Sequence, residues 1–241
     1  MKVFIGFDDT DDVNAIYGTG KVVRWFTPKL PEDCRPRGVV RQQLLVDPAI
    51  PYTSHNSAAC MVVEITAPER IPCLIAKAID HIRHYAAQGS DPGLCVVREN
   101  SAALSVLMTF GRRCTHAVTS QTEALRAARG AHLSGHGGTN DGIIGAAAAV
   151  GLTASGWSGR YIELGELRSA PEIMTVAEIQ RRDIQVLAED RDARIPAPQD
   201  QVLTNRWLRP RLLGHRPVLL VRPQSERSEE RRVGKECATG C

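Results

Sequence analysis

The 241-residue sequence predicts a soluble α/β protein, because patterns of buried strands and amphipathic helices follow one another along the chain. Residues 3–7 form a short apolar run without strict alternation, as in a strand that helices cover on both faces of its sheet. Residues 68–85 place apolar side chains at i, i+3 and i+4 spacing, which predicts a helix with one buried stripe. The hydrophobic content of 43% is enough to bury a sizeable core.

An acidic loop follows the first predicted strand. Asp8, Asp9, Asp11 and Asp12 fall within five residues, and these carboxylates repel one another unless a cation, arginines or free solvation offsets their charge. Mg²⁺ prefers a few carboxylates together with phosphate oxygens and water, so a carboxylate pair at the end of a strand suits a Mg-nucleotide site. The spacing is equally consistent with a solvated acidic turn in which one aspartate caps the next helix.

A turn stiffened by proline is a second candidate site. The sequence predicts a short helix at residues 20–26 and strands at residues 39–46 and 58–65. Between the two strands, the prolines of residues 47–52 fix the backbone near an extended form. Such a turn can hold Tyr52, His55 and Asn56 at a binding site, although an ordinary Pro-rich turn has the same features.

Two histidines lie on the predicted helix 68–85, on the side away from its apolar stripe. His81 and His84 are one helical turn apart, a spacing that can hold a metal ion. Their neighbours Lys77 and Arg83 favour a solvated face instead. The helix is followed by a predicted turn at residues 89–93, a strand at 94–97, and a helix that a capping box at 120–123 opens and that ends near residue 130.

The second stretch with chemical information is residues 134–151, SGHGGTNDGIIGAAAAVG. Glycines let backbone N–H groups approach phosphate oxygens, and the positive end of the following helix attracts an anion. The candidate phosphate-binding residues are Gly135, Gly137, Gly138, Thr139, Asn140 and Asp141. The stretch is neither a Walker A loop nor a GxGxxG fingerprint after a strand. Glycines that let the helix pack closely on its neighbour, with Asn140 or Asp141 as its N-cap, explain the pattern equally well.

Charge and cysteine usage narrow the classes of protein. A formal net charge of +3 and a pI of about 8.5 permit a nucleic-acid partner without arguing for one. The N-terminus does not resemble a secretion signal, and no apolar stretch is long enough to span a membrane. Seven cysteines without a CxxC pair suit reduced cytoplasmic thiols and argue against a zinc ribbon.

The C-terminal third predicts smaller elements. We expect a strand at residues 160–167 and a helix that starts at the capping box 175–178 and carries an apolar stripe as far as residue 187. Residues 195–198, IPAP, are the best candidate for a linker. Trp207 stands among arginines that suit either RNA or solvent, namely Arg206, Arg209, Arg211 and Arg216. Residues 225–241 resemble a translated sequencing adapter and do not enter the fold prediction.

Several phrases, taken in order, resemble the N-terminal half of the archaeal isoleucine-tRNA agmatinylcytidine synthetases. They are GFDDTDD with Thr19 after it, DPAIPY with His55 and Asn56 after it, SDPG, and GHGGTNDGIIGAAAAVGL, and NRWLRPRLLGHRPVLLV resembles a segment of that family's ferredoxin-like domain. The resemblance implies a kinase-like main domain with a mixed sheet and flanking helices at residues 1–168. It also implies a partial ferredoxin-like region at residues 169–223, whereas the OB-fold and zinc ribbon of full-length members are not expected here. Independently of the resemblance, we expect residues 224–241 to be a disordered or artefactual tail.

The resemblance also implies a chemistry. Members of that family are understood to use ATP and Mg²⁺ to phosphorylate the carbonyl oxygen of a tRNA cytosine, after which agmatine displaces the phosphate. By this resemblance Asp8, Asp9, Asp11 and Thr19 are catalytic, Asp8 and Asp9 also hold the metal ion, the glycine-rich residues 135–141 hold the nucleotide, and the residues around the proline turn hold the substrate. Thr19 lies in a Gly-Thr-Gly sequence where the family tends to have Cys-Thr-Thr. The competing interpretation is a non-catalytic protein that binds a nucleotide or metabolite.

Overall fold

The computed structural model describes residues 1–50, 55–189 and 194–223, which fall into two compact units. The first comprises Met1–Gly165 and Leu212–His215, and the second comprises Glu166–Arg211 and the residues from Arg216 onward. The chain therefore divides between residues 165 and 166, and the predicted linker at 195–198 lies inside the second unit. Over the described ranges, no helix is both long and apolar enough to cross a membrane.

The first unit is a sheet covered by helices on both faces. Its strands follow the order β5-β4-β1-β3-β2-β6, and each neighbouring pair runs antiparallel. The strands are β1 (Lys2–Asp8), β2 (Cys34–Gln43), β3 (Ser57–Ile65), β4 (Gly93–Arg98), β5 (His132–Gly135) and β6 (Arg160–Glu163). The helices are α1 (Thr19–Phe26), α2 (Ile71–Tyr85), α3 (Ala103–Arg113), α4 (Gln121–Ala127) and α5 (Gly142–Ser155), with short 3₁₀ turns at Thr27–Lys29 and Pro68–Arg70.

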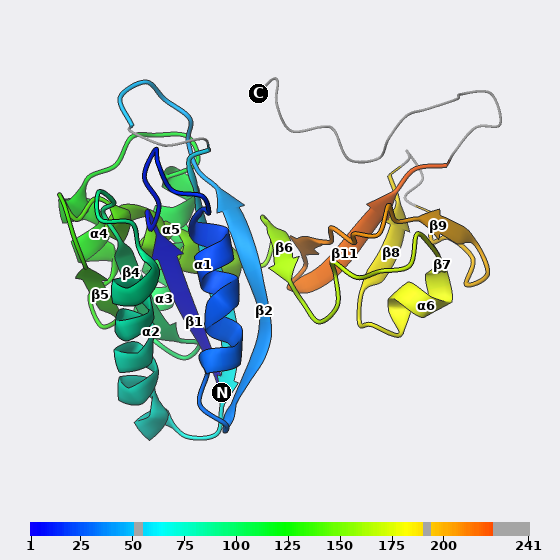
Figure 1. Cartoon of the computed structure of the whole chain (residues 1–241), viewed down its shortest axis with the longest axis horizontal. Helices are drawn as coiled ribbons and strands as arrows, with labels where there is room; N and C mark the ends of the chain where they lie inside the picture. The colour runs from blue at the N-terminus through cyan, green and yellow to red at the C-terminus, as the bar shows by residue number, and fades with distance from the viewer. Residues whose placement is uncertain (51–54, 190–193, 224–241) are drawn as a thin grey trace. The chain divides into compact units, whose positions relative to one another are not determined.

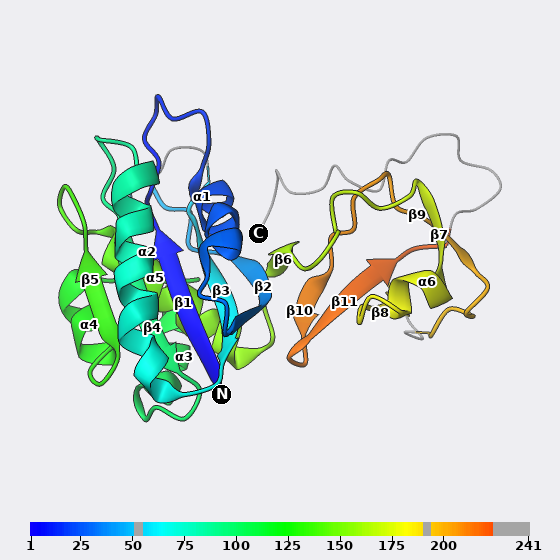
Figure 2. The same ribbon diagram turned by 60° about the horizontal axis from the view of Figure 1, so that its bottom comes forward.

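Strand β1 lies in the middle of this sheet. Figures 1 and 2 show α1 and α2 on one face and α3 and α5 on the other. Each face has its own apolar cluster: residues 3, 5 and 7 of β1 pack under α1 and α2, while Phe4 packs with α3 and α5. All of Val3–Phe7 is buried, which confirms the prediction of a strand covered on both faces.

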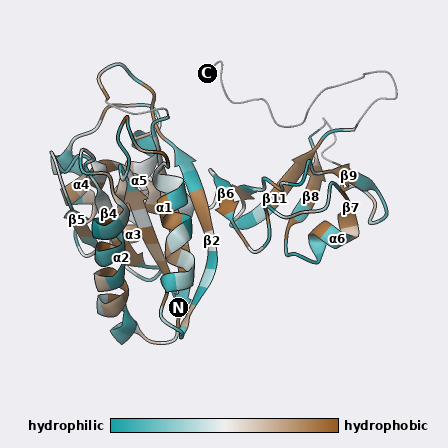
Figure 3. Cartoon of the chain, in the orientation of Figure 1, coloured by the Kyte–Doolittle hydropathy of each residue, from teal (hydrophilic) through white to brown (hydrophobic). Residues whose placement is uncertain are grey.

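Helix α2 confirms the amphipathic pattern but not the placement of both histidines. Figure 3 shows hydrophobic and hydrophilic colours side by side on this helix. His84 is exposed as predicted, whereas His81 is 3% exposed and its Nε2 donates to the carbonyl oxygen of Val22 at 2.8 Å. The prediction that His81 lies on the solvent face is wrong, because α1 packs against that side of α2 and covers the ring.

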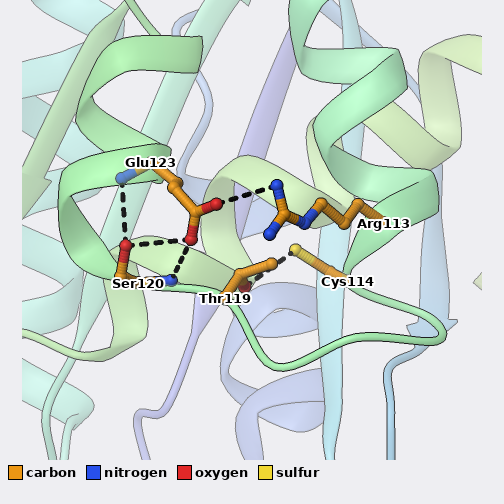
Figure 4. Close-up of polar contacts among 5 residues, drawn as sticks. All are labelled: Arg113, Cys114, Thr119, Ser120 and Glu123. Atoms are coloured by element: carbon orange, nitrogen blue, oxygen red, sulfur yellow. Dashed lines mark hydrogen bonds and ion pairs between the residues drawn. The ribbon is translucent and has the colours of Figure 1, made fainter.

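Helix α4 begins at the predicted capping box (Figure 4). The Ser120 hydroxyl accepts from the backbone N–H of Glu123, and the Glu123 carboxylate accepts from the backbone N–H of Ser120 at 2.9 Å. Arg113 at the end of α3 adds an ion pair of 2.9 Å to Glu123. These contacts satisfy the first donors of α4 and join α3 to α4.

The described part of the second unit contains short strands and one helix. They are β7 (Ile173–Thr175), α6 (Val176–Gln180), β8 (Gln185–Ala188), β9 (Gln201–Leu203) and β11 (Arg216–Val221), and β10 (Arg211–Leu213) lies at the boundary between the units. The capping box at Thr175 is confirmed, but α6 ends at Gln180, so the expected apolar stripe continues into β8 instead of along the helix. Strands β8 and β11 are parallel. Together with the antiparallel ladders of the first unit, this pair confirms the mixed α/β fold class.

Candidate active site

The acidic loop and the glycine-rich loop meet at one edge of the first unit's sheet. Asp8, the last residue of β1, pairs with Gly93 of β4, and Gly93 in turn pairs with Gly135, the last residue of β5. The SDPG turn directly precedes β4 at the same edge. Strand β3 also starts there, because Phe7 pairs with Ala59. The register therefore gathers four loops that are far apart in the sequence, at the upper end of β1 in Figure 1.

Asp8 lies against the first turn of α5. A Cβ added to Gly145 would lie 1.8 Å from Oδ2 of Asp8, so only a glycine leaves room for this carboxylate. Gly142 similarly permits contact between the helix start and the SDPG turn, where a Cβ would lie 2.2 Å from the carbonyl oxygen of Asp91. Burial, and then the charge of Asp9, raise the pKa of Asp8 to about 8.

Asp9 belongs with Asp8 to a group of neighbouring carboxylates. Burial raises the pKa of Asp9 to about 6, and the charges of Asp91, Asp11 and Asp141 contribute to the same shift. Its backbone φ of +51° belongs to the left-handed region that non-glycine residues seldom adopt. Within the described ranges, no group of three or more His, Cys, Asp or Glu side chains is arranged to hold a metal ion. A metal held here by Asp8 and Asp9 would therefore take its remaining ligands from phosphate oxygens and water, as Mg²⁺ commonly does.

Asp11 and Thr19 form a buried structural link at the start of α1. Oδ1 of Asp11 accepts from the backbone N–H of Thr19 at 2.9 Å and from its hydroxyl at 3.0 Å. The Thr19 hydroxyl in turn accepts from the backbone N–H and the hydroxyl of Thr10, both at 3.1 Å. A threonine hydroxyl has one donor and two acceptor positions, so all three are used. Asp11 therefore accepts from the first residue of α1, whose N-cap residue is Gly18, and these bonds tie the acidic loop to the helix start.

The glycine-rich loop folds around Asp91. The Asp91 carboxylate accepts from the backbone N–H of Thr139 at 2.9 Å and also from its hydroxyl. Gly138 has a φ of +54°, and a Cβ there would lie 1.3 Å from Oδ1 of Asp91. Gly135 similarly makes room for the side chain of Asn140, and Asp141 accepts from Nε2 of Gln121 at 2.7 Å. In this structure the loop thus surrounds a carboxylate, and the phosphate-binding role of residues 135–141 stays a prediction.

The residues of the proline turn are only partly described. Asn56 donates from Nδ2 to the carbonyl oxygen of Leu45 at 2.6 Å, and its own carbonyl oxygen accepts from the backbone N–H of Leu44. The Asn56 side chain thus holds the connection between β2 and β3. His55 is exposed next to it, and Tyr52 lies outside the described residues. Both Asn56 and His55 directly precede β3, at the edge of the sheet that carries the acidic loop.

Comparisons with known proteins give one consistent result. No protein-family model and no curated protein matches the chain. Among solved structures, apo TiaS, a tRNA agmatidine synthetase, matches with a TM-score of 0.52 and 25% identity over 63% of this chain and 35% of that one. The complex of TiaS with its tRNA and ATP matches with a TM-score of 0.54 and 26% identity over 63% and 36% of the two chains. The complex of TiaS with its tRNA, AMPCPP and agmatine matches with a TM-score of 0.54 and 25% identity over 75% and 44%.

The chain resembles an N-terminal part of TiaS. It spans less than half the length of the TiaS chains that it matches. The similarity confirms the resemblance that the sequence phrases indicated, and it agrees with the mixed α/β fold described above.

Sequence reasoning missed three residues that shape the candidate site. Asp91 belongs to the SDPG phrase, which the sequence analysis identified as a turn and as part of the family resemblance but not as part of the site. Gly142 and Gly145 looked like packing residues of α5, whereas Gly145 faces the Asp8 carboxylate. The signal that could have revealed them is position, because SDPG precedes a strand and therefore ends at the same sheet edge as the acidic loop.

Proposed function

We propose that this chain catalyses Mg-ATP-dependent phosphoryl transfer and ligation on a tRNA cytidine, with agmatine or a similar small amine as the second substrate. The observation that carries the proposal is the gathering of Asp8, Asp9 and Asp91 at the glycine-rich start of α5, with the pKa values of Asp8 and Asp9 raised. Carboxylates in this condition favour a bound cation, and carboxylate oxygens are the donors that Mg²⁺ prefers. Solved TiaS complexes contain tRNA with ATP, and tRNA with AMPCPP and agmatine.

The proposed roles follow from the positions of the side chains. Asp8 and Asp9 would hold Mg²⁺, which when bound neutralises phosphate charge. The backbone around Gly137 and Gly138 would face the phosphates once Asp91 releases Thr139. Thr19 and Asp11 would position the acidic loop and not touch the reacting atoms. His55 and Asn56, together with Tyr52 outside the described residues, stay candidates for substrate contact.

The proposed reaction has two steps. The cytosine carbonyl oxygen attacks the γ-phosphorus of ATP, so that an O–P bond forms and ADP leaves. The amine then attacks the ring carbon that carries the phosphorylated oxygen, and a C–N bond forms. The C–O bond breaks, the oxygen departs as part of inorganic phosphate, and the nitrogen loses a proton. The first step is needed because a carbonyl oxygen is a very poor leaving group. Catalysis would rest mainly on positioning and on charge neutralisation.

We assign the nucleotide chemistry to residues 1–168 as a kinase-like domain and treat residues 169–223 as a partial ferredoxin-like region. The described cysteines support a cytoplasmic location, because Cys34, Cys60, Cys95 and Cys114 are free and buried and Cys73 is free and exposed. A second function, non-catalytic nucleotide binding, is favoured by the Thr19 hydroxyl, whose hydrogen-bonding positions are all used within the protein.

An assay with labelled ATP separates the two functions. We expect the chain, incubated with γ-labelled ATP, Mg²⁺ and total tRNA, to release phosphate and to attach labelled agmatine to tRNA. Attachment should require both ATP and Mg²⁺. Binding of Mg-ATP without any turnover would support the non-catalytic protein instead. A chain that neither binds nor consumes ATP would contradict both functions.

A further inference from the structure

Three aromatic side chains form a row on the outside of α1 and α2. The ring centroids of Tyr17 and Trp25 are 4.8 Å apart, and those of Trp25 and Tyr85 are 5.3 Å apart. Tyr17 belongs to the loop that carries the acidic residues, Trp25 to α1 and Tyr85 to the end of α2. All three rings are half-buried, so part of each is open to solvent. The row therefore runs from the candidate active-site loop across two neighbouring helices, which Figures 1 and 2 show on the same face of the sheet.

Lysines accompany the rings along the whole row. Nζ of Lys21 lies 5.9 Å from the ring centre of Tyr17 and 5.2 Å from that of Trp25. Nζ of Lys29 lies 4.2 Å from the ring centre of Tyr85 and donates to its hydroxyl at 3.0 Å. Lys77 and His84 border the same hollow as Lys29, and its one carboxylate, Asp80, is 3.9 Å from Arg83. We call the six residues Tyr17, Lys21, Trp25, Lys29, Lys77 and Tyr85 the lysine–aromatic strip.

Buried contacts between α1 and α2 hold the strip in shape. The His81 ring lies between Phe26, at 5.1 Å, and Tyr85, at 4.6 Å. Its Nε2 donates to the Val22 carbonyl oxygen, and burial lowers the pKa of His81, so the ring stays neutral at physiological pH. The two helices are thus fixed relative to each other. A surface that is already ordered loses less conformational entropy when a ligand binds.

We propose that the lysine–aromatic strip binds a single-stranded RNA segment next to the candidate active site. Aromatic rings stack on nucleic-acid bases, and lysine ammonium groups neutralise the phosphates between them. The strip carries three lysines, and the carboxylate of Asp80 beside it is 3.9 Å from Arg83. The net charge of the whole chain is only +3, so the attraction for a polyanion is concentrated locally. The choice of RNA as the partner rests on the proposed function. The geometry of the strip does not.

By contrast, the tryptophan of the second unit suits this role less well. The ring of Trp207 is covered by the guanidinium groups of Arg209 at 3.6 Å and Arg168 at 4.2 Å. Its faces are therefore already in contact with cations, and a base would have to displace them. In the strip, Nζ of Lys21 lies farther from the rings of Tyr17 and Trp25 than the guanidinium groups lie from Trp207. The flexible Lys21 side chain can therefore move aside for a base at little cost.

The test measures binding of a fluorescent twelve-nucleotide oligouridine by anisotropy, without ATP. We expect the variant Lys21→Glu/Lys29→Glu/Lys77→Glu to bind at least about tenfold more weakly than the wild type. Its salt dependence should also fall by about two in the slope of log K against log salt, since each single-strand phosphate contact contributes about 0.7. Trp25→Leu keeps an apolar side chain but removes the ring, and should weaken binding by roughly tenfold through lost stacking.

The matched control reverses three exposed arginines that are not part of the strip. Arg112, Arg126 and Arg129 lie on or directly after α3 and α4, so Arg112→Glu/Arg126→Glu/Arg129→Glu changes the net charge equally. This control should change affinity less than about threefold. Equal losses in the two triple variants, or equally tight binding of a duplex of the same length, would overturn the strip as a single-strand site. Wild-type protein that binds Mg-ATP but not oligouridine would overturn it as well and leave the proposed function standing.

Discussion

Asp8 and Asp9 are held in conditions that favour their neutral forms. Both are half-buried, and the negative charges of neighbouring aspartates add to burial in raising the pKa of each carboxyl. A group whose folded pKa exceeds its unfolded value makes the fold less stable as pH rises between the two values. For Asp8 this range extends from about 3.8 to about 8, and for Asp9 from about 3.8 to about 6. In the metal-free protein these two carboxyls should therefore cost increasing stability as the pH rises from 4 to 8.

Replacing Asp8 with asparagine should remove most of this loss. We expect the metal-free Asp8→Asn variant to melt roughly 3 °C or more above the wild type at pH 8, because each pKa unit corresponds to about 1.4 kcal/mol. The difference should shrink towards pH 4, because this pH is close to the unfolded pKa of about 3.8 and little free energy is then needed to keep the folded carboxyl neutral. Melting curves across this pH range measure it, with the exposed Asp80→Asn as a control that should show no such trend. A variant that is less stable at pH 8 would contradict the burial argument.

The Thr19 hydroxyl is hydrogen-bonded to Thr10 and Asp11 in this structure. Valine in its place would leave the buried backbone N–H of Thr10 without an acceptor and would free Asp11 from the hydroxyl. We expect Thr19→Val to cost about 1–3 kcal/mol in urea unfolding, whereas Thr19→Ser, which keeps the hydroxyl, should cost less than about 1 kcal/mol. If Thr19→Val is as stable as the wild type and loses only turnover, the hydroxyl acts in the reaction and not in the loop.

Individual residues were the hardest features to predict from sequence. The cluster of aspartates indicated a charged site, but the sequence contains no sign that Asp11 bonds to Thr19 at the start of α1 while Asp8 lies against α5. That difference depends on how α5 approaches β1, which is a tertiary contact. The misplacement of His81 has the same cause, because the helical period was correct and the covering helix α1 was not foreseen.

Among the elements, helix α5 shapes the site most directly. Its small residues let it approach the sheet so closely that a Cβ on Gly93 would lie 2.1 Å from the carbonyl carbon of Gly142. Of the two explanations that the sequence left open for this stretch, the contacts support close packing, and phosphate binding stays a prediction. Gly142 and Gly145 serve packing, and that packing brings the Asp8 carboxylate to the helix start.

A comparison of two glycines tests how the loop before α5 is built. Gly138 and Gly165 share a φ of +54°, but only Gly138 has a neighbour, Asp91, within 4 Å of an added Cβ. Gly165→Ala should cost about 1–2 kcal/mol through backbone strain alone. Gly138→Ala should cost about 1–3 kcal/mol more, because Asp91 must move and release the N–H of Thr139. Urea unfolding measures both, and equal costs would show that Asp91 does not order this loop.

Local patterns predicted the elements well where the signal was periodic or capped. The buried strand β1, the amphipathic helix α2 and the capping boxes of α4 and α6 all follow from such signals. The predicted helix at α6 was too long, because the apolar residues of a short helix and of the strand after it can together resemble the stripe of one longer helix. The loops at the site carry no period, so their shapes depend on contacts such as that between Asp91 and Thr139.

At the scale of the whole molecule, the strand order of the first unit explains why distant phrases of the sequence form one site. Antiparallel pairing of β1 with β4, and of β4 with β5, brings the end of β1, the start of β4 and the end of β5 to the same edge. The order of the phrases indicated a resemblance to a known enzyme family, but not that arrangement in space. The solved TiaS structures match the chain over most of its length, in agreement with one shared fold.

The central claim, that Asp8 and Asp9 bind ATP through Mg²⁺, is tested most directly by calorimetric titration of ATP with and without the metal ion. In Mg²⁺ we expect Asp8→Asn/Asp9→Asn to bind ATP at least about tenfold more weakly than the wild type and than the control Asp80→Asn, because two metal ligands are lost. In EDTA the double variant should bind no more weakly than the wild type, since the carboxylates then only repel the triphosphate. Equal affinity of the double variant and the wild type in Mg²⁺ would contradict the account.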